Sequence, residues 1–122
     1  MEGLFERGVE EFNGRFFFDA HDTWEELWRE TTGPQRLFYQ GLIQTAVGFY
    51  HLSNKNYKGA CSQLGKAISK LEQYMPAYHG METEQLLHRL RVCLSDAECL
   101  RNGETVRCEE SKIPQIQFGE TE

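Results

Sequence analysis

A histidine and a glutamate one helical turn apart are the most chemically suggestive residues of this sequence. His21 and Glu25 fall within an aromatic-rich stretch that begins at Phe16 and ends at Trp28. At about 100° per residue, side chains four positions apart lie on one face of a helix. A carboxylate can then orient the imidazole, whose other nitrogen is left to act as a general base, a metal ligand or a hydrogen-bonding group. These two residues are the candidate catalytic residues.

A second stretch supplies polar side chains that could meet this pair. Gln40, Gln44 and His51 lie on one stripe of the segment 37–54, which contains no charged residue. A buried amide without a hydrogen-bond partner costs about 1–3 kcal/mol, so these glutamines need partners. We expect the partners to be the imidazole and the carboxylate described above. The candidate ligand or pocket residues are therefore Phe17, Trp28, Gln40, Gln44 and His51.

Known metal-binding motifs are largely absent. A di-iron helix bundle needs a Glu three residues before each ligating His, but Phe18 stands there before His21 and Gly48 before His51. The H-E-x-x-H motif is missing, and a single His-Asp dipeptide is too short for a phosphohydrolase signature. No cofactor is predicted. One divalent metal ion held by His21, Glu25 and His51 stays an open alternative.

Two kinds of function fit these residues. In the first, His21, Glu25 and the glutamines form an inward-facing polar network in a binding or scaffold module, whose groove receives a small molecule, a peptide or a second copy of the chain. In the second, the protein is a small hydrolase-like or metal-assisted enzyme in which His21 is base or ligand, Glu25 orients it and Gln44 donates to the substrate. Polar networks between helices more often fix packing than perform catalysis, which favours the module.

The composition narrows the class of protein. The chain has 122 residues, 39% of them hydrophobic and 12% aromatic, which is enough for one packed core. The net charge is 13 − 19 = −6 without a long basic run, so we expect neither nucleic acid nor a membrane as partner. Because residues 1–13 include acids and no long apolar stretch, we expect a cytoplasmic protein without a secretory signal. The cysteines, Cys61, Cys93, Cys99 and Cys108, are expected to be free thiols.

Apolar residues at helical spacing predict an all-α bundle of about five helices. The helices are expected over about 2–12, 15–30, 34–53 and 57–74, with the apolar face of a fifth over 86–100. The third is apolar nearly all round but interrupted by polar residues, which indicates a central helix of a bundle and not a membrane span. Its Gly41 and Gly48 would let a neighbouring helix approach closely, although each costs about 1 kcal/mol of helix propensity.

The domain is expected to span residues 1–103. Residues 104–122 have only Ile113, Ile116 and Phe118 as large apolar side chains. We expect this tail to be extended, laid on the bundle or frayed at its end.

Several blocks of residues also resemble a known family. They are FNGRFF at 12–17, AHD at 20–22, WEELW at 24–28 and QGLIQ at 40–44, followed by Ala46, His51 and Gly59-Ala60. The stretch from about Leu4 to Leu71 is similar to a prokaryotic family of small helical proteins, domain of unknown function number three-hundred-and-nine. The resemblance implies an all-helical fold, a shared His and Glu on the second helix and shared Gln on the third. This chain has His21-Asp22 where the family usually has His-Glu, and the family brings no established activity.

Overall fold

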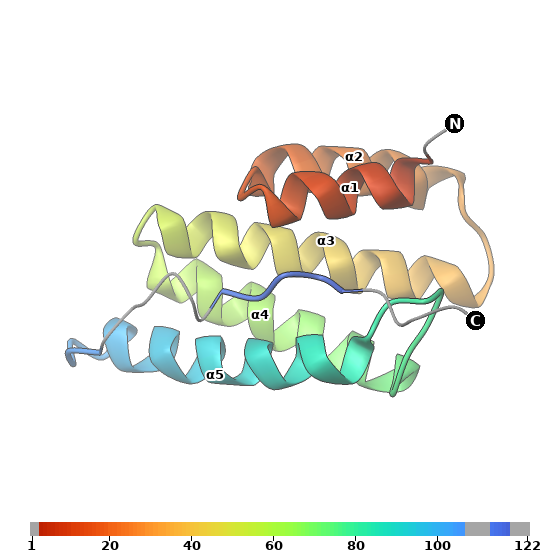
Figure 1. Cartoon of the computed structure of the whole chain (residues 1–122). Helices are drawn as coiled ribbons and strands as arrows, with labels where there is room; N and C mark the ends of the chain where they lie inside the picture. The colour runs from red at the N-terminus through yellow and green to blue at the C-terminus, as the bar shows by residue number, and fades with distance from the viewer. Residues whose placement is uncertain (1–2, 107–112, 118–122) are drawn as a thin grey trace.

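The segments with helical periodicity form the predicted helices. The structure is a computed structural model that describes residues 3–106 and 113–117. In these residues it contains five α-helices and one short 3-10 helix: α1 (Leu4–Asn13), α2 (Phe17–Glu30), α3 (Pro34–Ser53), α4 (Tyr57–Leu71), η1 (Glu72–Tyr74) and α5 (Thr83–Arg101). Successive helices run antiparallel, with α1 and α2 on one side of α3 and with α4 and α5 on the other (Figure 1). The expected all-α bundle around a central apolar helix is confirmed.

Local residue chemistry sets the ends of the helices. Pro34 occupies the first turn of α3, where its missing N–H costs nothing. Arg15 has a left-handed backbone (φ 71°), so α2 begins at Phe17, two residues later than predicted. Before α4, the side chain of Asn56 accepts a hydrogen bond from the N–H of Gly59 and caps the helix.

The central helix packs tightly against α4 at two glycines. A Cβ atom on Gly48 would lie 2.7 Å from Cδ2 of Leu64, and one on Gly41 would lie 2.9 Å from Cδ2 of Leu71. Real Cβ contacts are not that short, so the two leucines occupy space that any larger residue on α3 would take. The close approach predicted from these glycines is confirmed.

We predict that Gly48→Ala lowers the free energy of unfolding by about 1–3 kcal/mol, because the added methyl group overpacks the contact with Leu64. Gly65 is a matched control, since it lies inside α4 with no atom near the position of a Cβ. There, Gly65→Ala should raise the free energy of unfolding by about 0.5–1 kcal/mol. Urea unfolding followed by circular dichroism measures both; equal stability of the Gly48 variant and the wild type would contradict the prediction.

Aromatic rings fill the space between α3 and the α1–α2 pair. The ring of Phe12 lies 5.2 Å from that of Phe17 and 5.8 Å from that of Phe49, measured between centroids. Trp24 is fully buried, and its indole N–H donates to the carbonyl of Phe5 at 3.2 Å. This core fixes the side of α2 that faces inward, and therefore also the orientation of His21.

The histidine at the 78–81 turn belongs to a separate aromatic group. His79 stacks on Tyr39 with an angle of 7° between the rings, and Tyr78 packs against His79 edge-on. Burial raises the pKa of the Tyr39 phenol, and Tyr78 and Glu6 add to this effect. The group joins the start of α3 to the turn before α5.

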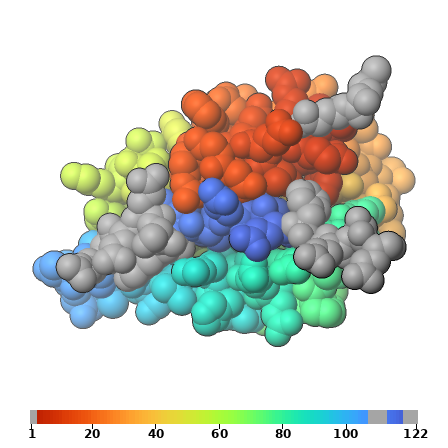
Figure 2. All heavy atoms as spheres, in the orientation of Figure 1, coloured from red at the N-terminus to blue at the C-terminus, as the bar shows by residue number. Residues whose placement is uncertain are grey.

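Residues 113–117 are extended and lie between the α1–α2 turn and α5 (Figure 2). Phe118 and Cys108 fall outside the described residues. Cys61 and Cys99 are free cysteines. No helix in the described part of the chain is long and apolar enough to cross a membrane.

Candidate functional site

The predicted imidazole–carboxylate pair is present on α2. Nε2 of His21 lies 2.9 Å from Oε2 of Glu25, and the two side chains are 23% and 32% exposed. The acidic residues on the opposite face of the helix, Asp19, Asp22, Glu26 and Glu30, are exposed. The helical periodicity that buries Trp24 therefore places His21 and Glu25 at the edge of the core, between the protein interior and solvent.

The second nitrogen of the imidazole has no hydrogen bond. Nδ1 of His21 is buried and unpartnered, although Oδ1 of Asp22 lies 3.5 Å away. A neutral ring that donates its Nε2–H to Glu25 has an acceptor at Nδ1. A buried acceptor without a donor is unfavourable, so a hydrogen-bond donor that reached this atom would be stabilising.

The expected glutamine partners do not reach the pair. Within the described residues no hydrogen bond joins Gln40 or Gln44 to His21 or Glu25, and Oε1 of Gln44 is buried without a partner. Instead, Oε1 of Glu25 accepts from Nη2 of Arg29 at 2.6 Å. Both carboxylate oxygens are thus engaged along α2 itself, and the network differs in this respect from the one expected.

A small cavity opens between α2 and α3 beside His21. It has a volume of about 210 Å³ and is lined by Phe18, His21, Val47, Tyr50 and His51. His21 and His51, both candidates from the sequence, therefore share one cavity. The imidazole of His51 is held through Nδ1 by the side-chain amide of Asn56, at 3.3 Å.

Two of the cavity's aromatic residues are unusually exposed. Phe18 is 52% and Tyr50 37% exposed. Their ring centroids lie 5.4 Å apart, and the Phe18 ring is 5.7 Å from the His21 ring. Tyr50 and Val47 were not among the predicted pocket residues, although their spacing to His51 places all three on one side of α3.

The other candidates lie elsewhere. Phe17 is in the core, 6% exposed, against Phe12 and Phe49. The guanidinium of Arg36 lies 3.7 Å above the ring of Trp28, a cation–π contact. Nε1 of Trp28 is buried without a hydrogen-bond partner. Over residues 3–106 and 113–117, His, Cys, Asp and Glu side chains form no group of three or more that could hold a metal ion.

We predict a weak coupling between His21 and Glu25, because solvent screens a partly exposed pair on one helix. A double-mutant cycle with His21→Ala and Glu25→Ala should give a coupling energy of about 0.3–0.5 kcal/mol. The Glu25–Arg29 pair is also four residues apart. A control cycle on this pair should give a coupling energy of similar size. A coupling above about 2 kcal/mol would show that the pair is embedded in a larger buried network.

The fold and this cavity define a small antiparallel helical domain with an imidazole at the edge of an aromatic-lined cavity. Residues 5–62 match a family model described as "Domain of unknown function (DUF309)". The match confirms the resemblance found in the sequence, and it covers α1 to the first turns of α4. His21, Glu25, Gln40, Gln44 and His51 all lie within the matched stretch. No curated protein matches the chain.

Proposed function

We propose that this protein is a binding module whose site is the cavity between α2 and α3. The observation that carries the proposal is the combination of an unpartnered Nδ1 on His21 with two exposed rings at the same cavity. Neighbouring exposed apolar side chains often mark an interaction site. Phe18 and Tyr50 both line this cavity, and the only other exposed large hydrophobic residues in the described part of the chain are Phe16 and Met75.

The size and lining of the cavity restrict the ligand. A volume of about 210 Å³ is below the ~300–1,000 Å³ of typical sites for drug-sized molecules and cofactors. It suits one aromatic ring or one branched aliphatic group. The aromatic rings and Val47 in the lining favour a ligand with an apolar body. Nδ1 of His21 favours a ligand that also carries an N–H or O–H donor. We therefore propose a small apolar ligand, or a peptide side chain of that size, which carries one hydrogen-bond donor.

The enzyme alternative has one supporting observation, the 2.9 Å contact by which Glu25 could orient His21 as a base. The positions of the ring nitrogens argue against it. Nε2 is taken by the carboxylate, and Nδ1 is buried. A substrate proton and a ligand donor must both reach this buried nitrogen, so the ring has to turn toward the cavity in either case. The aromatic and aliphatic lining of the cavity favours binding of an apolar group.

We predict that phenol binds this cavity more tightly than toluene, because the two probes have the same ring and only phenol has an O–H donor. His21→Phe should weaken phenol binding about 5–10-fold through loss of the acceptor, with little effect on toluene. His88→Phe is the control, since His88 is exposed on α5 and does not line the cavity. Amide chemical-shift titrations measure both affinities. Equal binding of phenol and toluene, or shifts that map away from α2 and α3, would contradict the proposal.

A metal-dependent function makes a different prediction. If the protein is a binding module of this kind, it should contain far less than one equivalent of any divalent metal when it is purified without a metal-affinity tag. Elemental analysis of the wild type and of the His21→Phe and His51→Phe variants measures this. One equivalent of metal in the wild type, lost in both variants, would overturn the proposal in favour of a site formed by His21, Glu25 and His51.

A further inference from the structure

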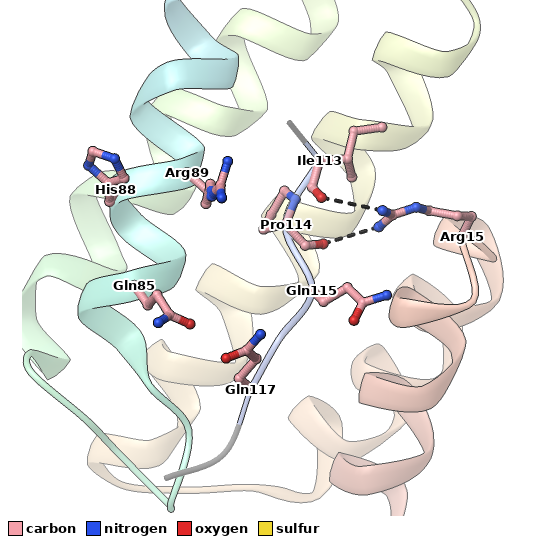
Figure 3. Close-up of a pocket in the computed structure, with 8 residues that line it drawn as sticks. All are labelled: Arg15, Gln85, His88, Arg89, Ile113, Pro114, Gln115 and Gln117. Carbon is pink, nitrogen blue, oxygen red and sulfur yellow. Dashed lines mark hydrogen bonds between the residues drawn. The ribbon is translucent and has the colours of Figure 1, made fainter. Parts of the chain in front are cut away.

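In a different part of the molecule, the helices contact an extended segment of the same chain. Residues 113–117 (Ile-Pro-Gln-Ile-Gln) run through a groove between the α1–α2 turn and α5 (Figure 3). The groove is distinct from the cavity beside His21, because the two share no lining residue.

The side chain of Asn13 binds the backbone of the segment at one residue. Its Nδ2 donates to the carbonyl of Ile116 at 3.1 Å, and its Oδ1 accepts from the N–H of Ile116 at 2.8 Å. A neighbouring β-strand would offer the same donor and acceptor pair. The amide of Asn13 therefore recognises extended backbone whatever side chain is attached to it.

Arg15 binds the backbone two residues earlier. Its guanidinium donates to the carbonyl of Pro114 at 3.1 Å and to the carbonyl of Ile113 at 3.3 Å, as the dashed lines in Figure 3 show. Arg15 itself has a left-handed backbone with φ 71°, which is uncommon for a residue other than glycine and unfavourable. The residue that binds the segment therefore has an unfavourable backbone conformation.

The remaining contacts follow the pattern of a strand. The N–H of Glu82 donates to the carbonyl of Gln117 at 2.8 Å. Pro114 and Ile116 are buried, the latter only 3% exposed, whereas Gln115 and Gln117 are exposed. Alternate side chains thus anchor the segment, while hydrogen bonds to its backbone supply most of the polar contacts, a known mode of peptide recognition.

The groove is also wider than the segment that lies in it. A cavity of about 510 Å³ borders the segment and is lined on the α5 side by Gln85, His88 and Arg89 (Figure 3). The open cavity leaves a path by which the segment can leave and another peptide can enter.

From these contacts we propose that this groove is a peptide-binding site, which the chain's own residues 113–117 occupy in this structure. The partner is an extended protein segment with an apolar residue, a proline, a variable residue and an isoleucine in succession. Asn13 and Arg15 bind its backbone, and its isoleucine takes the buried position of Ile116.

Attachment to the same chain gives the resident segment an advantage. A short tether produces an effective concentration of about 1 mM, so a free peptide of equal intrinsic affinity at about 0.1 mM is outcompeted roughly tenfold. A partner therefore binds well only when the resident segment is displaced. Weakening that segment should open the site.

The test uses the full chain and a fluorescent peptide that spans residues 111–119, followed by fluorescence anisotropy. We expect the Ile116→Glu variant to bind this peptide at least tenfold more tightly than the wild type does, because its own segment no longer fits. Adding Asn13→Ala to that variant should weaken binding about 5–10-fold. Gln115→Ala, which changes an exposed side chain of the segment, should behave like the wild type. If Ile116→Glu does not fold, as judged by circular dichroism, the milder Ile116→Ala takes its place.

Other outcomes would overturn the proposal. Equal affinity of the wild type and the Ile116 variant, or no binding to either, would show that residues 113–117 are a fixed part of the fold. A wild-type dimer that the peptide converts to monomers, as measured by light scattering, would mean that the groove is filled by a second copy. His21→Phe should leave peptide binding unchanged, which separates this proposal from the function proposed for the cavity beside His21.

Discussion

The close contact between α3 and α4 is the constraint on which the arrangement of the other helices depends. Leu64 and Leu71 occupy the space left by the missing side chains of Gly48 and Gly41, so one side of α3 is committed to α4. The aromatic side of α3, which includes Phe49, is then free to pack against α1 and α2. The central helix uses both of these sides for packing, and Val47, Tyr50 and His51 near its end line the cavity beside His21.

Along the interface between α2 and α3, the polar groups are only partly paired. Along α2, Glu25 connects His21 to Arg29. Across the interface, Nδ1 of His21, Nε1 of Trp28 and Oε1 of Gln44 are buried without partners. Most buried polar groups in proteins are hydrogen-bonded, so three such atoms contributed by one pair of helices are an unusual concentration. This incomplete interface, more than the ion pair itself, distinguishes the region from ordinary helix packing.

Sequence reasoning captured features that depend on local spacing. Apolar periodicity located the five helices, Gly41 and Gly48 indicated the close approach of α4, and the four-residue spacing of His21 and Glu25 predicted their contact. The sequence did not predict which hydrogen-bond partner a side chain reaches. Glu25 bonds to Arg29 on its own helix and not to a glutamine on the next, an option that the same spacing rule could have indicated. The contacts of Asn13 and Arg15 with residues 113–117 join positions about one hundred residues apart, and no local pattern encodes them.

The backbone contacts of Asn13 and Arg15 also have a consequence for the order in which the protein is completed. Synthesis proceeds from the N-terminus, so the helices on both sides of the groove are made before residues 113–117. The contacts of Asn13 and Arg15 can therefore form only after nearly the whole described chain has been made.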